Sequence, residues 1–357
     1  MAGKRQHILP RFLQRGFASN IVSKPNGRET VFTWYYLKGL EPCEITTENV
    51  GLEKHFYGKA GELSVDNDIT NLEDMFAPVI RELRAKHDGY QITASTLADF
   101  VGHLSIRTKH VRDSFIDIAE IFTDTLFRFL ANHQNFRWWT LEYHKRHPEV
   151  MRKILDEQFK KMGVPRFQRR LALESLTSEK RLEFISAVID RDQSEYESTF
   201  LTFRSELLQK IPSMTKDGHI KALAKSLIAA PRAEDYRALN WFVCNSPEPL
   251  ILGDVGCLFE VAGPKQYMTI TGKDDELKAV YLPISSDRLI VGTASPTAPL
   301  IDFDEIKRAF AEHSRDYFIC REDSQEGREL QKLLGTKAQV LTDDEIKEIF
   351  IDVLSES

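Results

Sequence analysis

The sequence lacks the short motifs that identify several large enzyme classes. It contains no G-x-G-x-x-G, no G-x-x-x-x-G-K-[ST], no H-E-x-x-H and no G-x-S-x-G. The first two motifs build glycine-rich turns around nucleotide phosphates, the third binds zinc on a helix, and the fourth presents a nucleophilic serine. A nucleotide-dependent transferase, a zincin protease and an α/β-hydrolase therefore have no support in the sequence.

Cysteine is scarce, and long apolar runs are absent. The four cysteines form no C-x-x-C pair, which argues against a zinc ribbon and against a disulfide framework. No apolar run reaches the ~18 residues that a membrane-spanning helix needs. The N-terminal residues lack the apolar core and the small-residue cleavage site of a secretory signal. We therefore expect a cytoplasmic, reduced protein with no membrane partner.

The charge is unevenly distributed along a chain of 357 residues whose net charge is −6. Residues 1–28 hold six Lys or Arg and no acidic residue, and residues 145–170 hold nine basic and three acidic residues. Residues 321–357 reverse the sign, with ten acidic and five basic residues. Such runs are often solvated faces, but two separate basic segments in an acidic chain also suit a polyanion. We therefore consider nucleic acid as a partner of segments 1–28 and 145–170.

Strand signals occur in two stretches that bracket a helical block. Residues 238–294 contain short apolar and β-branched runs separated by turn sequences, and residues 29–60 open with the strand-forming run ETVFTWYYLK. Between them, residues 68–235 repeat apolar residues with the periodicity of helices. The pattern predicts an α+β fold in which both strand groups share one mainly antiparallel sheet, covered by the helices.

Two of the predicted helices carry polar residues beside their apolar stripes. The apolar spacing over residues 68–83 predicts one kinked helix that continues through Pro78. Residues 95–132 predict a second long helix, on which His103, Arg107 and His110 form a polar stripe. We interpret this stripe as polar residues at a boundary between helices.

The C-terminal tail is predicted to be a separate helical appendage. We expect one α+β domain over residues 1–320 and the appendage over residues 321–357. The last helix opens with a capping box, Thr342-x-x-Glu345. Its apolar face would form an exposed patch if it had no partner surface. We therefore expect it to dock on the body or on a second subunit of a homo-oligomer. That face comprises Ile346, Ile349, Phe350, Val353 and Leu354.

The N-terminal run Q-H-x-x-P-R-F-L-x-x-x-F resembles a mostly bacterial family of proteins of unknown function, numbered four-two-three-eight. The resemblance extends over roughly the whole chain to Phe318, and the family usually has Ser-Asp-Asn-Pro where this chain has Gly253 to Gly256. It implies kinship of fold and no established activity. The further matching motifs are His55-Phe56-Tyr57, Asn71-Leu72-Glu73, a helix with a central Arg107, a turn with Gly253-Asp254, and the strand Tyr281 to Ser285.

Polar residues at the ends of predicted elements are the remaining candidates for a site. In a metal-assisted phosphodiesterase, Glu73 and Asp254 would hold Mg²⁺ or Mn²⁺ through their carboxylate oxygens. His7 would activate water, Arg107 would face the phosphate, and Gln6 would orient the loop. The sequence thus suggests His7, Gln6 and Arg107 as catalytic residues, with Glu73 and Asp254 as metal ligands.

A structural interpretation of these residues stays open beside the catalytic one. Gln6 and His7 would then satisfy backbone groups at a buried chain start, and Arg107 would pair with Glu73. Two functions follow: a metal-dependent hydrolase of the nuclease type acting on nucleic acid, or a non-catalytic nucleic-acid-binding or protein-assembly module. Convergence of His7, Glu73, Arg107 and Asp254 in one cleft would favour the hydrolase.

Overall fold

The chain divides into two compact units, each made of more than one segment. One unit comprises Met1–Asp117 and Ser213–Thr342, and the other comprises Ile118–Pro212 and Asp343–Ser357. The predicted boundary at 320/321 does not coincide with this division, because the tail is shared between the units. The computed structural model describes residues 5–59, 64–93, 95–191, 193–228, 230–264, 266–272 and 274–356.

All strands in the described part of the chain lie in the first unit and pair antiparallel, in three sheets. Together with the helices they confirm the predicted α+β class. The two-stranded sheet consists of β1 (Arg5–His7) and β5 (Leu52–Lys54). The five-stranded sheet consists of β2 (Asn20–Ser23), β3 (Glu29–Leu37), β4 (Cys43–Thr46), β8 (Leu252–Gly253) and β13 (Tyr317–Cys320). The six-stranded sheet consists of β6 (Tyr90–Ile92), β7 (Asn240–Asn245), β9 (Leu258–Val261), β10 (Tyr267–Met268), β11 (Leu277–Ser285) and β12 (Arg288–Thr293).

The single sheet expected from residues 29–60 and 238–294 needs correction. Of the later group, only β8 joins the sheet that contains β3, and it does so through β13, which pairs with both. Strand β13 lies outside both predicted strand groups. The other strands of the later group follow the order β10-β9-β11-β12-β7 and form their own sheet, with β6 at its edge.

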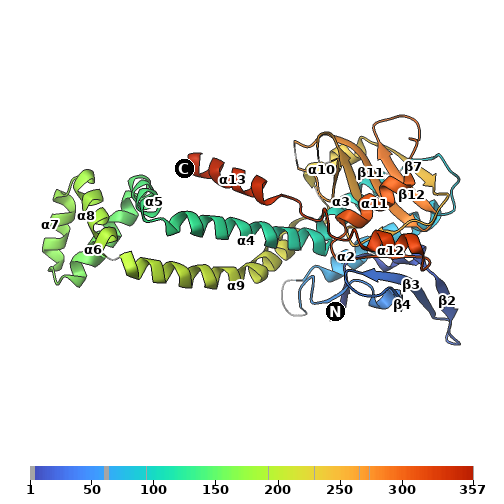
Figure 1. Cartoon of the computed structure of the whole chain (residues 1–357), viewed down its shortest axis with the longest axis horizontal. Coiled ribbons are helices and arrows are strands. Elements are labelled where there is room, and N and C mark those ends of the chain that lie inside the picture. The colour runs from blue at the N-terminus through green and yellow to red at the C-terminus, as the bar shows by residue number, and fades with distance from the viewer. Residues whose placement is uncertain are drawn as a thin grey trace. The chain divides into compact units, whose positions relative to one another are not determined.

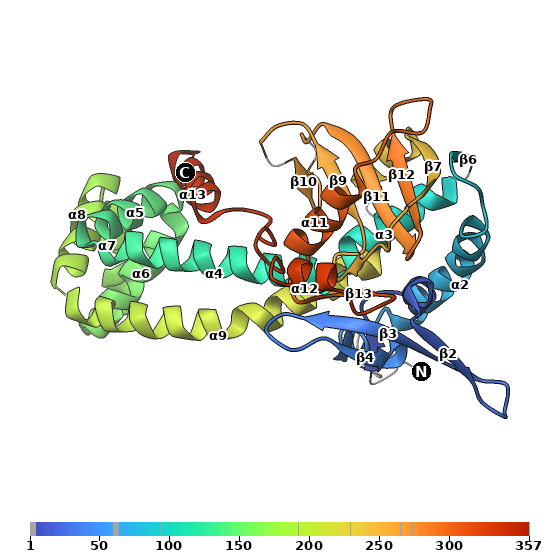
Figure 2. The ribbon, with the colours of Figure 1, turned by 45° about the vertical axis from the view of Figure 1, so that its right-hand side comes forward.

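The six-stranded sheet supplies much of the core of the first unit. Strands β11 and β12 form a hairpin around Ser286 and Asp287, and β12 pairs with β7 in turn (Figure 2). A side chain at Gly292 on β12 would lie 2.7 Å from the Trp241 ring, so glycine is what lets this ring lie across the strand. Buried residues of α3, among them Phe100 and Leu104, belong to the same core cluster as Phe259, Leu282 and Ile290 of this sheet.

The helices of the first unit include the two that carry candidate residues. Helix α2 (Asp66–Leu83) continues through Pro78, as predicted. The helix predicted over residues 95–132 is instead two helices, α3 (Ser95–Arg107) and α4 (Lys109–Ala131). Thr108 separates them. Its hydroxyl accepts a hydrogen bond from the Val111 N–H at 3.3 Å, as the side chain of a threonine N-cap does. The remaining helices are α1 (Arg11–Gln14), α10 (Ala230–Arg237), α11 (Phe303–His313), α12 (Gln325–Gln331) and the 3-10 turns η1 (Arg15–Phe17) and η2 (Thr47–Asn49).

Every regular element in the described residues of the second unit is a helix. Helices α4 and α9 (Gln193–Lys225) each contribute to both units, because the boundaries 117/118 and 212/213 fall inside them. A break at His147 divides α5 from α6, since Pro148 disfavours helical geometry at the residue before it. Among the described helices, none is both long enough and apolar enough to cross a membrane. The other helices of this unit are α5 (His133–Arg146), α6 (Pro148–Lys161), α7 (Arg166–Ser175), α8 (Ser178–Arg191) and α13 (Asp343–Glu356) (Figure 1).

Helix α13 packs on α4 through part of the predicted apolar face. The Phe350 ring lies 5.3 Å from the Phe122 ring and 5.9 Å from the Phe129 ring, measured between ring centroids. Ile346 is also buried, whereas Ile349 is 44% exposed. The side chains of Val353 and Leu354 lie outside the described residues. The appendage thus docks within its own chain through Ile346 and Phe350.

Truncating this contact should destabilise the second unit. We expect Phe350→Ala to lower the free energy of unfolding by about 3 kcal/mol, because it leaves a cavity between α13 and α4. Ile351→Ala is the matched control, since Ile351 is 62% exposed on the same helix, and it should change stability by less than about 0.5 kcal/mol. Urea unfolding measures both. Equal, small losses in the two variants would show that α13 does not dock as described.

Candidate functional site

Gln6 binds the backbone of the turn at residues 57–58. This residue lies on β1, which pairs with β5 in the register Gln6 to Glu53. Its side chain is 2% exposed. The amide oxygen accepts a hydrogen bond from the Tyr57 N–H at 2.6 Å, and the amide nitrogen donates to the Gly58 carbonyl at 3.3 Å. Gln6 therefore acts as a positioning residue for the turn at residues 57–58.

Arg107 is the centre of the polar arrangement. It is the last residue of α3 and is 1% exposed. Its Nε donates to the Tyr57 hydroxyl at 3.0 Å, and its Nη2 donates to the His7 carbonyl at 3.1 Å. Its Nη1 donates to the Glu73 carboxylate and to His103 Nε2, the latter at 2.8 Å. These contacts use four of the five N–H groups of a guanidinium. Arg107 thereby joins its own helix α3 to three other segments, at His7, Tyr57 and Glu73.

The electrostatics favour a charged arginine next to a neutral histidine. Burial lowers the pKa of Arg107, but Tyr57 and Glu73 outweigh it, so that its pKa is raised. Burial, aided by Arg107, lowers the pKa of His103 to about 3. His103 Nδ1 lies 2.8 Å from the Leu227 carbonyl and therefore carries the proton, which leaves Nε2 to accept from Arg107. His103 and Arg107 of the predicted stripe thus bind each other, while Arg107 also binds α2 and His103 also binds the Leu227 carbonyl.

His7 presents its ring beside this centre. Its Nδ1 lies 3.3 Å from the Val50 carbonyl. A carbonyl only accepts, so this contact assigns the proton of neutral His7 to Nδ1 and makes Nε2 the basic nitrogen. The ring is half-buried, whereas Gln6 beside it is fully buried.

A cavity of about 380 Å³ brings these side chains together. One face of α2 forms a wall of it, because Asp66, Thr70, Glu73, Asp74 and Ala77 recur at helical spacing. The cavity thus contains an imidazole, guanidinium groups and carboxylates. The other residues that line it are Gln6, His7, Arg11, Phe12, Tyr57, Ile69 and Arg107.

Asp254 is not among the residues that line this cavity, so the expected convergence is incomplete. It follows β8, is 5% exposed, and uses both carboxylate oxygens on backbone groups. Oδ1 accepts from the Arg315 N–H at 3.0 Å, and Oδ2 accepts from the N–H groups of Asp316 at 2.7 Å and Tyr317 at 3.3 Å. The carboxylate thereby organises the chain at the start of β13. The sequence did not reveal this role, because the partners lie about sixty residues further on.

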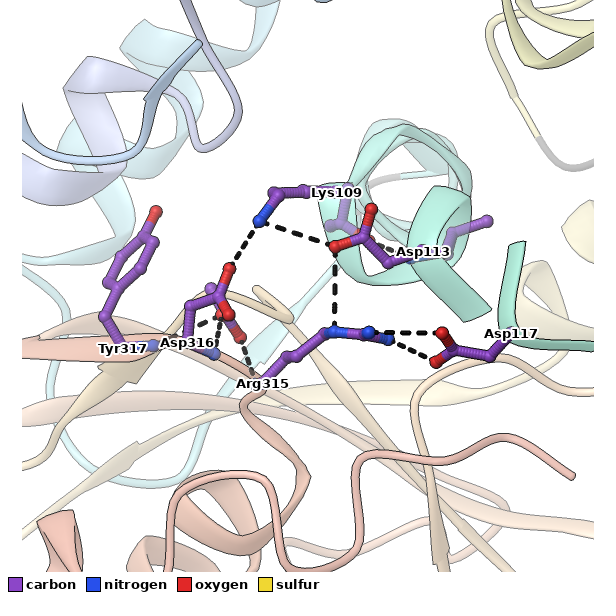
Figure 3. A network of polar contacts seen from close by, with 9 residues as sticks. Lys109, Asp113, Asp117, Arg315, Asp316 and Tyr317 are labelled. Carbon is purple, nitrogen blue, oxygen red and sulfur yellow. Dashed lines mark hydrogen bonds and ion pairs between the residues drawn. The ribbon is translucent and has the colours of Figure 1, made fainter. Parts of the chain in front are cut away.

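An ion-pair network continues from this loop to the first turns of α4 (Figure 3). Lys109 Nζ lies 2.6 Å from an Asp316 oxygen and 3.4 Å from an Asp113 oxygen. Arg315 pairs with Asp117 at 2.6 Å and approaches Asp113 at 3.6 Å. All of these contacts except the 3.6 Å approach of Arg315 to Asp113 are close enough for direct hydrogen bonds. The charges compensate one another, which makes this network a connection between α4 and β13.

Carboxylates close enough to share a metal ion lie outside the cavity around His7. Within the described ranges, the one group of three ligand atoms close enough to share an ion belongs to Glu248, Asp304 and Glu326. Lys307 Nζ already pairs with all three, at 2.8 Å from Glu248 and 3.0 Å from Asp304. Its side chain is 1% exposed, and the three carboxylates raise its pKa although burial lowers it. The lysine ammonium therefore takes the position that a metal ion would need.

The two basic segments occupy separate units. In segment 1–28, Arg11 and Arg15 line cavities, while Lys4 and the side chain of Arg5 lie outside the described residues. Segment 145–170 spans the end of α5, helix α6 and the start of α7 in the second unit. Eight of its Lys and Arg residues are exposed, and six of these eight pair with no carboxylate of the described residues: Arg146, Arg152, Lys153, Lys160, Lys161 and Arg166.

Three residues of the arrangement, Tyr57, His103 and Arg11, were not among the predicted site residues. Tyr57 lies in the motif that begins at His55, and His103 precedes Arg107 by one helical turn, so both had a local signal. Arg11 stands in the N-terminal motif itself. What the sequence did not show is that the Tyr57 hydroxyl and His103 Nε2 both point to Arg107.

The fold and the site define an α+β protein with a buried arginine centre between β1, α2 and α3. Over residues 5–314 the chain matches the family described as Protein of unknown function (DUF4238), and it belongs to that family. The match confirms the resemblance based on the N-terminal motif, and it includes every residue that lines the cavity. Comparison with curated proteins and with solved structures found no match.

Proposed function

We propose that this protein is a hydrolase of the nuclease type, which cleaves phosphodiester bonds of nucleic acid in the cavity around His7. The observation that carries the proposal is the presence of His7, Glu73, Arg107 and Arg11 along one cavity of about 380 Å³. The imidazole of His7 can activate water, and the exposed guanidinium of Arg11 can complement a phosphate. The cavity therefore has both components that phosphodiester hydrolysis needs.

His7 is the proposed general base. Its Nδ1 is engaged by the Val50 carbonyl, so the basic electron pair is on Nε2. In the proposed reaction Nε2 takes a proton from water as the water oxygen bonds to phosphorus; the P–O bond to the leaving nucleotide breaks, and solvent supplies the proton of the leaving oxygen. Arg107 and Gln6 act as positioning residues: Arg107 holds the His7 carbonyl and the Glu73 carboxylate, and Gln6 holds the turn at Tyr57.

The carboxylates of α2 are suited to a Mg²⁺ or Mn²⁺ ion. Asp66, Glu73 and Asp74 offer the oxygen ligands that these ions prefer. A magnesium ion in a phosphate-binding site commonly takes one or two carboxylates and completes its shell with water and substrate phosphate. A preformed cluster of three ligands is then not required. Asp254 does not fit the role of ligand, because backbone N–H groups occupy both of its oxygens.

The test is the His7→Ala variant. We expect cleavage of single- or double-stranded DNA or RNA, in the presence of Mg²⁺ or Mn²⁺, to fall by at least about 100-fold, because the general base is removed. The melting temperature should stay nearly unchanged, since the backbone carbonyl of His7 still accepts from Arg107. His87→Ala is the matched control, an exposed histidine outside the cavity, and it should cleave like the wild type. Equal activity of both variants would place the reaction elsewhere.

A non-catalytic nucleic-acid-binding protein is the second candidate function. The six exposed cations of segment 145–170 that pair with no carboxylate of the described residues favour it. When such cations bind a phosphate backbone, they release its counterions. Binding without cleavage by the wild-type protein, with either metal, would select this candidate. Under both candidates we place the protein in the cytoplasm, where its unpaired cysteines would stay reduced.

A further inference from the structure

A second cavity adjoins the residues of the first. It has a volume of about 540 Å³ and shares Arg11, Phe12 and Ala77 with the cavity around His7. Helices α1 and α2 supply most of its wall, and Arg15 comes from the turn that follows α1. The remaining residues that line it are Arg15, Glu29, Arg81 and Arg84.

The helical spacing explains why the four arginines line the same cavity. Arg11 and Arg15 lie four residues apart across α1 and the following turn. Arg81 lies four residues after Ala77 and three before Arg84, the residue that caps the C-terminus of α2, so successive members of this series are neighbours on the helix surface. Two short stretches of chain thus direct four guanidinium groups at a single cavity.

The positive charge of this cavity is only partly compensated. Arg15 pairs with Glu29, and Arg11 pairs with Glu48 at 3.0 Å. Arg84 donates to backbone carbonyls of Phe12, Leu13 and Ile284, which carry no charge. Burial foremost, together with the charges of Arg15 and Arg81, lowers the pKa of Arg84 to about 10, although Asp287 raises it in part. Repulsion among the arginines is therefore present, and an anion would relieve it.

Arg81 is the cation that is available to such an anion. It is exposed, and no ion pair or hydrogen bond links its side chain to any of the described residues. A guanidinium can hold two phosphate oxygens through parallel N–H bonds. Because Arg81 is exposed, little free energy is needed to desolvate it, and its attraction to a phosphate is not cancelled by that cost.

We infer that the cavity of Arg11, Arg15, Arg81 and Arg84 is a phosphate subsite, which holds a backbone phosphate of a nucleic-acid strand beside the one to be cleaved. The inference rests on the proposed function for the identity of the strand. Arg81 binds the phosphate directly, and Arg84 is fixed by three carbonyls and supplies charge from behind. Arg11 borders both cavities and contacts the strand between the two phosphates.

The experiment compares Arg81→Gln with Arg321→Gln, a control at an exposed arginine that likewise has no partner among the described residues. Binding of a short single-stranded oligonucleotide to the full chain is measured in EDTA, so that no cleavage occurs. We expect Arg81→Gln to weaken binding by about 10-fold or more. The slope of log K against log salt should become less steep by about 0.7, the value for one phosphate contact on a single strand. The control should change neither quantity.

An unchanged affinity and slope for Arg81→Gln would overturn the subsite. Titration with inorganic phosphate separates the sources of the anion. If Arg81→Gln abolished binding of inorganic phosphate but left oligonucleotide binding unchanged, the cavity would serve a free anion and the inference would be wrong. Loss of oligonucleotide binding in the variant supports it.

Failure of the subsite and failure of the proposed function give different results. If wild-type protein binds the oligonucleotide through Arg81 but cleaves it with neither Mg²⁺ nor Mn²⁺, the subsite stands and the hydrolase does not. If Arg81→Gln binds and cleaves like the wild type while His7→Ala does not cleave, the hydrolase stands and the subsite does not.

Discussion

Replacing Arg107 by alanine is expected to lower the free energy of unfolding by about 3 to 5 kcal/mol. The guanidinium is 1% exposed and donates to Tyr57, Glu73, His103 and the His7 carbonyl. The variant leaves these acceptors in a buried environment without a donor, and it leaves the Glu73 charge without its partner. Removing one member of a buried ion pair is costly for this reason.

A double variant distinguishes the lost pairing from the lost packing. Arg107→Met keeps much of the side-chain volume, and Glu73→Gln removes the charge that would otherwise be unpaired. We expect the double variant to be clearly more stable than the sum of the two single effects predicts. Urea unfolding of the four proteins supplies the cycle. A loss below about 1 kcal/mol for Arg107→Ala, or strict additivity, would contradict the central role of this arginine.

Asp254→Ala should destabilise the protein by about 3 kcal/mol or more, because three backbone N–H groups lose their acceptor. These groups belong to Arg315, Asp316 and Tyr317, at the start of β13. The effect is expected although Asp254 does not line the cavity around His7. Asp254→Asn retains one oxygen as acceptor and should lose less. A variant Asp254→Ala with an unchanged melting temperature would show that the carboxylate does not organise β13.

The same carboxylate should make stability depend on pH. Burial foremost, with the nearby Asp316, raises the pKa of Asp254 from the ordinary 3.8 to about 7, although the backbone hydrogen bonds lower it in part. Between these values the folded chain holds a proton that the unfolded chain has released. The contribution of this proton to stability is therefore full below about pH 4 and is lost as the pH rises toward 7.

The measurement is the difference in unfolding free energy between the wild type and Asp254→Asn at several pH values from about 4 to 8. Asparagine does not titrate, so the comparison isolates Asp254 from the other ionisable groups. The charged groups facing the loop, Lys109, Asp113 and Arg315, are the same in both proteins. The advantage of the wild type should shrink as the pH rises. A constant or growing advantage would contradict the raised pKa.

The sequence by itself determined the secondary structure of most segments, because local patterns carry that information. The helix through Pro78, the strands of residues 240–245 and 277–293, and the apolar face of the last helix all follow from the spacing of apolar residues. The N-terminal motif also identified the family. Gln6 and His7 of this motif both line the cavity described above.

Only the tertiary structure decided which strands pair and what each buried polar group contacts. Strand β13 connects β3 to β8, and Phe318 pairs with Tyr36 at a separation of more than 280 residues along the chain. Asp254 resembled His7 and Arg107 as a polar residue at the end of an element, yet its carboxylate is used by the backbone of residues 315–317. Local spacing cannot reveal such contacts, because a buried charge is satisfied by whichever donor the folded chain brings within hydrogen-bond distance.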